Sequence, residues 1–258
     1  MKNESIVAAK KVVHLKAITD TCQLCHAKDL CMSSCLKPDD MERFKHIIGH
    51  RAPMDRGQRL YMAGEHINSI YVLHSGSVKS YLESEDGESQ ITGFYLPGDV
   101  IGIHGLKNAT HSDTVEALET SSVCALRFSK IEDISTAFPP LQNQIMRFVF
   151  SEMDHDQEMM MVLGKMSADR RMAYFLLDMA KRLKNQGLSN SRINLTMTRH
   201  DIANYLGLAV ETVSRILTRM QKSEIIDVER RSITILDHAK LKNTYSCVED
   251  DIVNSHFQ

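Results

Sequence analysis

Strand-like runs dominate the middle of this 258-residue chain, and helix-like periods dominate its last third. Between residues 51 and 128, apolar and β-branched residues gather in four runs: IYVLHS, VKSYLES, SQITGFYL and SVCALRF. Turn signals such as Ser75-Gly76, Asp86-Gly87 and Pro97-Gly98 separate these runs. Short strands at this spacing are typical of a small antiparallel barrel or roll. An irregular α+β domain is the alternative interpretation.

Two helices are predicted on either side of these strands. The stretch KPDDMERFKHIIGH, residues 37–50, is expected to form a short helix with Asp39 or Asp40 near its cap. A long helix is expected over residues 140–166, because the helical pattern follows two prolines and meets no breaker before Gly164.

The long helix carries a heptad-like seam. Its members recur at steps of three and four residues, and they are Met146, Val149, Met153, Asp156, Met160 and Leu163. Such a seam either packs on the chain's own roll or joins two copies of the chain. In a dimer Asp156 would face its own copy, and two like charges there repel. A dimer built on this seam would therefore be weak and easily switched.

Residues 198–226 have the pattern of a helix-turn-helix. Thr198 and Asp201 resemble a capping box, and Gly207 supplies a tight turn between two helices with apolar faces. The N-terminal end of the second helix is expected to enter the major groove of DNA. Base contacts are expected from Glu211, Ser214 and Arg215, and phosphate contacts from Arg199, Arg219 and Lys222. Thr212 is expected to be exposed on the same helix and to belong to the DNA-binding face. The alternative is an αα-hairpin with a solvated charged face.

The charge distribution supports the DNA-binding interpretation. The whole chain has a formal net charge of −2, but residues 165–242 hold 15 Lys and Arg against 8 Asp and Glu. Such asymmetry indicates that the basic part meets an anion.

Other function classes find little support in the sequence. There is no signal peptide pattern and no apolar run of membrane-span length, so we expect a cytoplasmic protein with no membrane partner. No phosphate-binding glycine loop, HExxH motif or nucleophile elbow is present, so we expect no enzyme. The loop histidines His104 and His111 are candidate ligands, but solvated histidines are the more common outcome.

Four of the six cysteines lie within fourteen residues: Cys22, Cys25, Cys31 and Cys35. Thiols stay reduced in the cytoplasm, so this cluster favours metal or redox chemistry over structural disulfides. Cys124 lies in a strand-like run, where a lone cysteine is usually a small buried apolar residue.

The order of these parts resembles the CRP/FNR family of bacterial regulators, over about residues 20–240. The segments ITGFYLPGDVIG, ALETSSVCAL, RINLTMTRHDIANYLGL and VETVSR are similar to FNR-type members, as is the C-x2-C-x5-C spacing. The resemblance implies an α+β fold with an N-terminal β-roll, a jelly roll like that of cyclic-nucleotide-binding domains. A long dimerisation helix and a C-terminal winged helix-turn-helix follow. The expected boundaries are a cysteine-rich segment at 1–38, the roll at 39–138, the helix at 139–166, the DNA-binding domain at 167–240 and a tail at 241–258.

The resemblance also implies a [4Fe-4S] cluster on Cys22, Cys25, Cys31 and Cys124. Iron–sulfur clusters need four thiolates, and three close in sequence plus a remote one is a common arrangement. Cys35 is the rival ligand, but the family pattern leaves it and Cys247 out. The implied function is an oxygen-responsive homodimer that binds palindromic DNA without oxygen, contacts RNA polymerase, and releases DNA when oxygen destroys the cluster. The alternative is an FNR-like regulator whose cysteines bind zinc or sense thiol oxidation.

The sequence departs from the family pattern at three places. Gly98-Asp99 stands where cyclic-AMP-binding members have Gly-Glu, and no arginine lies between Arg59 and Arg127 to grip a phosphate. We therefore expect no cyclic nucleotide. Ala209 occupies the start of the recognition helix, where the family often has Thr or Ser, which loses a cap of about 0.5–2 kcal/mol. His26 follows Cys25 directly, inside the expected cluster loop.

Overall fold

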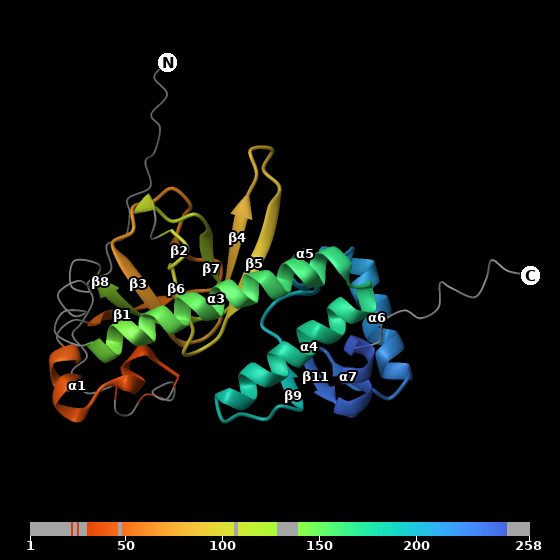
Figure 1. Ribbon diagram of the computed structural model, residues 1–258. Coiled ribbons are helices and arrows are strands. Elements are labelled where there is room, and N and C mark those ends of the chain that lie inside the picture. The colour runs from red at the N-terminus through yellow and green to blue at the C-terminus, as the bar shows by residue number, and fades with distance from the viewer. Residues whose placement is uncertain are drawn as a thin grey trace, which may run out of the picture.

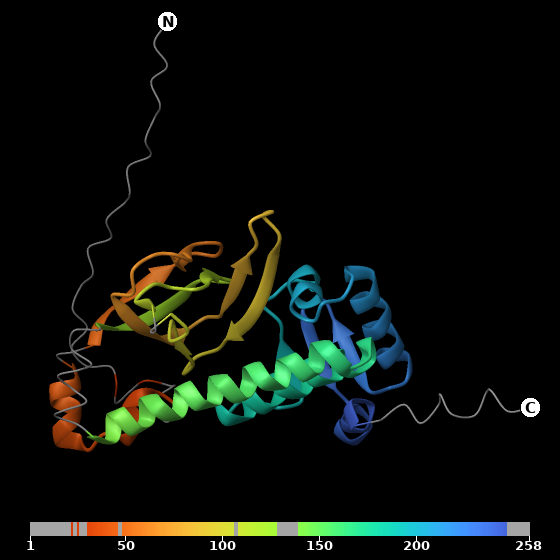
Figure 2. The ribbon, with the colours of Figure 1, turned by 45° about the horizontal axis from the view of Figure 1, so that its top comes forward.

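The computed structural model describes residues 22, 25, 30–45, 48–105, 108–127 and 139–246 of the chain. A roll of β-strands lies along one long helix, and a second domain of helices and short strands lies at the far end of that helix (Figures 1 and 2). His26 and Cys247 fall outside the described residues. Within the described part, no helix is long and apolar enough to cross a membrane.

The roll consists of two four-stranded antiparallel sheets, with strand orders β1-β8-β3-β6 and β2-β7-β4-β5. The strands are β1 (Ile48–Met54), β2 (Arg59–Tyr61), β3 (Ser69–Ser75), β4 (Val78–Glu83), β5 (Ser89–Tyr95), β6 (Val100–Ile101), β7 (Thr114–Ala117) and β8 (Ser121–Arg127). Buried side chains such as Leu73, Val78, Val115 and Val123 form one apolar cluster in the roll. Alternating burial along the strands produces this core, because successive side chains point to opposite faces.

The four strand-like runs correspond to β3, β4, β5 and β8, but the predicted helix over residues 37–50 is partly wrong. The short 3-10 helix η1 (Met32–Cys35) precedes α1 (Pro38–Lys45), and Ile48 already belongs to β1, where it pairs with Leu126. Ile48 packs with Phe44 and Leu126 in one apolar cluster. Pairing of a β-branched residue with β8 therefore overrides the local helical pattern.

Helix α3 (Pro139–Lys165) confirms the predicted long helix and runs the length of the molecule (Figure 1). Near its start, Leu141 is fully buried against the roll and η1. Near its end, Met159 and Val162 join the core of the C-terminal domain. Between these contacts the helix leaves large apolar side chains exposed: Met146, Phe150, Met153, Met160 and Met161.

The C-terminal domain is a winged helix-turn-helix. Its elements are α4 (Ala168–Asn185), β9 (Arg192–Asn194), α5 (Arg199–Tyr205), α6 (Val210–Lys222), β10 (Ile226–Glu229), β11 (Ser232–Ile235) and α7 (His238–Ser246). The strands form one antiparallel sheet in the order β10-β11-β9. Gly207 makes the turn between α5 and α6 at φ 60°, a conformation that glycine adopts at little cost.

Candidate functional site

Helix α6 presents a polar face beside a fully apolar one. Val213, Ile216, Leu217 and Met220 are buried and fix the helix on the domain. The predicted base-reading residues Glu211, Ser214 and Arg215 are exposed on the open side, and Thr212 is half-buried rather than exposed. A side-chain hydrogen bond of 3.2 Å from Arg215 Nη2 to Thr212 Oγ1 steers the guanidinium toward the N-terminal end of α6. Ala209 is the N-cap of α6, and its side chain accepts no hydrogen bond from the first turn. The missing cap that the sequence predicts is therefore present in the structure.

A shallow groove of about 400 Å³ follows this face, lined by Ser214, Arg215, Thr218, Arg219 and Lys222. Thr218 was not among the sequence-predicted residues, although its spacing of four from Ser214 places both on one helix face. Arg219 also forms an ion pair with Asp169 of α4, a contact between segments far apart in the sequence. The groove therefore carries three positive side chains, and one of them, Arg219, is held by an ion pair to a second helix.

The first helix of the motif begins with a capping box, as predicted. The hydroxyl of Thr198 accepts from the backbone N–H of Asp201 at 3.1 Å, and the Asp201 carboxylate accepts from the N–H of Thr198 at 2.8 Å. Arg199 is the first residue of α5 and is half-buried, which lowers the pKa of its guanidinium. It does not line the groove on α6.

A second candidate site lies at the other end of the molecule. Cys22, Cys25, Cys31 and Cys124 all line one small cavity, together with apolar side chains of Phe44, Ile48, Val72 and Leu126. Cys124 belongs to β8, and the other three cysteines precede η1. Residues about a hundred positions apart in the sequence thus bring four thiols to one apolar pocket.

Cys35 does not line this cavity. Its thiol donates to the carbonyl oxygen of Met32 at 3.3 Å, within the turn of η1. Burial raises the pKa of the Cys35 thiol. The structure therefore separates the rival cysteine from the four that the family pattern selects.

The cavity is about 20 Å³, which is room for about one water molecule. Among the described residues, no three His, Cys, Asp or Glu side chains are arranged to hold a single metal ion. The donor chemistry nevertheless suits a thiolate-bound cluster, because it combines four sulfur ligands with an apolar lining.

Comparisons with known proteins place the chain in one family. A Crp-like helix-turn-helix domain matches residues 170–244, and a cyclic nucleotide-binding domain matches residues 52–137. The fumarate and nitrate reduction regulatory protein of Vibrio cholerae is 43% identical over 220 residues, which cover 85% of this chain and 88% of that protein. The chain belongs to the CRP/FNR family of transcription regulators.

Other relatives agree with this CRP/FNR assignment. Electron transport regulator A of Shewanella oneidensis is 40% identical and covers 93% of each chain. The structure of FixK2 from Bradyrhizobium japonicum matches with a TM-score of 0.70 and 30% identity, over 77% of this chain and 98% of that one. These relatives confirm the predicted fold class, and they place the chain among FNR-type anaerobic transcription regulators, which are DNA-binding proteins rather than enzymes.

Asp99 stands where cyclic-AMP-binding members of the CRP/FNR family have an acidic residue that contacts the nucleotide. In this chain the Asp99 carboxylate binds other groups of the chain itself. Asp99 accepts from the backbone N–H of Leu96 at 2.7 Å and forms an ion pair with Arg182 of α4. Burial opposes the charge on Arg182, but Asp99 and Asp178 outweigh it and raise the pKa of the guanidinium. Asp99 therefore joins the roll to the DNA-binding domain.

The two loop histidines have different surroundings. His111 is 3% exposed and stacks on Tyr61 with ring centroids 3.5 Å apart, so the expectation that it is solvated is wrong. Its burial lowers the pKa of the imidazole. The imidazole is buried because it fills the interior of the roll beside Gly102, whose missing side chain makes room for it.

His104 lies in the roll after β6 and faces α3. Its Nε2 is 3.8 Å from a carboxylate oxygen of Glu152 and 3.7 Å from one of Asp156. Burial raises the pKa of Glu152 to about 7. Both groups border a cavity of about 790 Å³ between β5, α3 and α4.

The seam residues of α3 divide into two groups. Met146, Met153 and Met160 are 43%, 52% and 66% exposed. Val149 and Leu163 are half-buried against the chain itself. The side chain of Asp156 is 56% exposed, and its carboxylate lies 3.7 Å from Nε2 of His104 in its own roll. Phe150 and Met161 extend the exposed apolar stripe, and sequence spacing alone did not select them.

Proposed function

We propose that this regulator responds to oxygen through a [4Fe-4S] cluster held by Cys22, Cys25, Cys31 and Cys124. The observation that carries the proposal is the shared cavity of these four thiols. Four thiolates are the ligand set that such a cluster requires, and apolar side chains around it limit access of water. When bound, the cluster would supply an oxygen-labile link between the N-terminal segment and β8.

The contacts of η1 explain how order in the N-terminal segment would reach α3. Met32 is fully buried in one apolar cluster with Leu141 at the start of α3. Ile145 and Phe148 of α3 pack on the same cluster. Holding Cys31 in place therefore holds Met32 against α3 and fixes the position of that helix on the roll.

We infer that the exposed apolar stripe of α3 forms a homodimer. Burying the three exposed seam methionines and Phe150 in a second copy would remove large apolar surface from water. Asp156 weakens such a contact by charge repulsion, so a small gain in order elsewhere decides between monomer and dimer. The dimer would place two α6 helices about one DNA turn apart on a palindromic site.

The proposal includes one further partner and excludes one ligand. RNA polymerase is the expected protein partner of the DNA-bound dimer, with no residue assigned. A cyclic nucleotide is not expected, because Asp99 is engaged by Arg182 and no arginine lies between Arg59 and Arg127. A nucleotide phosphate would then lack the bidentate cation that usually grips it.

The test is an absorption spectrum with iron and acid-labile sulfide counts on protein purified without oxygen, followed by exposure to air. The proposal predicts brown protein with about four irons per chain, bleaching in air, and DNA binding that fades with the colour. A colourless protein with one zinc, or with free thiols and no metal, would contradict the cluster. DNA binding that persists in that protein would favour a zinc or thiol regulator.

A further inference from the structure

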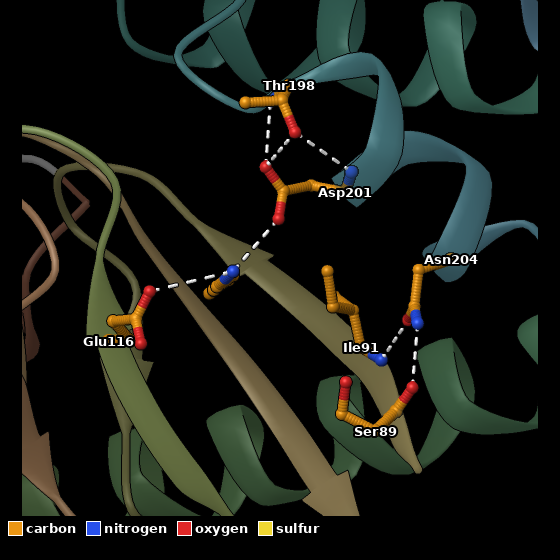
Figure 3. A network of polar contacts seen from close by, with 7 residues as sticks. Ser89, Ile91, Glu116, Thr198, Asp201 and Asn204 are labelled. Atoms are coloured by element: carbon orange, nitrogen blue, oxygen red, sulfur yellow. Dashed lines mark hydrogen bonds and ion pairs between the residues drawn. The ribbon is translucent and has the colours of Figure 1, made fainter. Parts of the chain in front are cut away.

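The helix-turn-helix is attached to the roll by directional polar contacts as well as by apolar packing. We call the group formed by Lys79, Ser89 and Ile91 of the roll with Asp201 and Asn204 of α5 the polar clasp (Figure 3). Its partners are separated by 113 to 122 residues along the chain. The polar clasp is therefore a tertiary link between the sensory roll and the DNA-binding domain.

Lys79 anchors the first turn of α5. Its ammonium donates to Asp201 Oδ1 at 2.9 Å, and the two side chains are only 18% and 9% exposed. Burial alone would raise the pKa of Asp201, but hydrogen bonds from Lys79 and Thr198 outweigh it and lower the pKa. This ion pair is shielded from solvent, so salt screens it less than a surface pair.

Asn204 anchors the last turn of the same helix. Its Oδ1 accepts from the backbone N–H of Ile91 at 2.6 Å, and its Nδ2 donates to the carbonyl oxygen of Ser89 at 2.7 Å. Strand β5 is the edge of its sheet, so these backbone groups have no strand neighbour on that side. One side chain thus satisfies both a donor and an acceptor of an open sheet edge.

Two anchors one turn apart restrict the rotation of α5. Beside them, Phe94 of the roll packs against Phe175 and Tyr205, with ring centroids 6.2 and 5.0 Å away. Aromatic packing tolerates small shifts, whereas hydrogen bonds weaken steeply when their angle changes. The polar clasp consequently selects one orientation of α5, and of α6 beyond Gly207, relative to α3.

We propose that the polar clasp sets the half-site spacing that the dimer accepts, with Lys79 and Asn204 as positioning residues outside the DNA-reading face. This inference rests on the proposed dimer and palindromic site. Because α3 holds the dimer and α6 reads each half-site, the orientation between them fixes the distance between the two reading helices. Loss of the polar clasp should leave each reading helix folded, but the distance between the two reading helices should become more variable.

The experiment uses the full chain, purified without oxygen. The unaltered protein first selects its site from random DNA duplexes. Fluorescence anisotropy then compares the selected palindrome, the same palindrome with two base pairs added between half-sites, and a single half-site. The variants are Lys79→Met, which keeps the aliphatic stem, and Lys79→Met combined with Asn204→Ala. Glu116→Gln is the matched control, because Glu116 contacts Lys79 from within the roll at 3.6 Å.

We expect Lys79→Met to reduce the preference for the selected spacing by about tenfold, the effect of losing one charge-assisted hydrogen bond. The double variant should reduce it further, while single half-site affinity changes less than about twofold. Glu116→Gln should retain the spacing preference. An unchanged preference in both clasp variants would overturn the inference and leave the proposed function intact. Selection of unpaired half-sites by the unaltered protein would overturn the inference together with the proposed dimer and palindromic site on which it rests.

Discussion

The helix-turn-helix domain and the N-terminal cysteine segment are attached to the same roll in different ways. The domain shares a continuous apolar core with the roll, reinforced by the polar clasp and the Asp99–Arg182 ion pair. The described part of the cysteine segment before α1 places Met32 in the core, with Cys31, Cys35 and Leu36 half-buried beside it. Regions with few buried apolar contacts open at low free energy. The segment is therefore the part whose position a bound group can control.

Helix α3 connects these two regions, because its start packs on η1 and its end lies in the core of the DNA-binding domain. Its middle carries the features that a switch needs. These are an exposed apolar stripe and a carboxylate pair, Glu152 and Asp156, facing His104.

Truncating one buried side chain in each region tests the comparison most strongly. Ile216 of α6 is 2% exposed, and Met32 of η1 is fully buried. Ile216→Ala should lower the free energy of unfolding by about 2–5 kcal/mol and abolish DNA binding. Met32→Ala should lower it by less than half as much, because the segment opens separately, and should speed thiol labelling of Cys31. Urea unfolding of the metal-free protein gives both values, and equal losses would break the comparison.

Glu152 should make stability depend on pH. Its pKa is raised to about 7 by burial, so the folded protein holds a proton that the unfolded chain releases. The free energy of unfolding therefore falls as the pH rises from about 4.5 to 7. Glu152→Gln should stabilise the protein by about 1–3 kcal/mol at pH 8 and much less at pH 5. Denaturant titrations at both pH values check this, with the exposed Asp154→Asn on the same helix as control.

Asp156→Ala removes the charge that opposes the proposed seam. We expect the dimer dissociation constant in air to fall by about tenfold or more, with DNA binding restored in air. Sedimentation velocity measures the association, and Asp154→Ala serves as the control off the seam. A variant that remains monomeric in air would show that the charge of Asp156 does not govern the dimer.

The smallest predicted effect concerns the start of α6. Ala209 has the extended conformation of an N-cap, with φ −72° and ψ 147°, but its side chain cannot accept a hydrogen bond. Ala209→Ser should raise the stability of the DNA-binding domain by about 0.5–2 kcal/mol. Ser167 caps α4 without a side-chain hydrogen bond, so Ser167→Ala should be nearly neutral. Thermal unfolding distinguishes the two, and no gain from Ala209→Ser would contradict the capping argument.

Local patterns were sufficient for the elements that form from local signals. The capping box at Thr198, the turn at Gly207 and the length of α3 all follow from neighbours a few residues apart. The start of β1 at Ile48 was mispredicted, because its partner is β8, nearly eighty residues away. The short strands β2 and β6 were not resolved individually, since two or three residues give too little periodicity.

The features of the sites that the sequence does not predict depend on contacts between residues far apart along the chain. Nothing near Arg219 in the sequence indicates its ion pair with Asp169, and nothing near Lys79 indicates Asp201. Likewise, spacing could not decide between Cys35 and Cys124. The fold distinguishes them, because β8 brings Cys124 to the cavity while the turn of η1 directs the Cys35 thiol to Met32.

The most direct test of the account is the iron and acid-labile sulfide content of Cys124→Ser and Cys35→Ser, each purified without oxygen beside the unaltered protein. The shared cavity predicts that Cys124→Ser loses the cluster and its colour, while Cys35→Ser keeps about four irons per chain. The opposite result, with Cys35→Ser colourless and Cys124→Ser brown, would contradict the proposed ligand set. It would also mean that the N-terminal segment is not linked to β8.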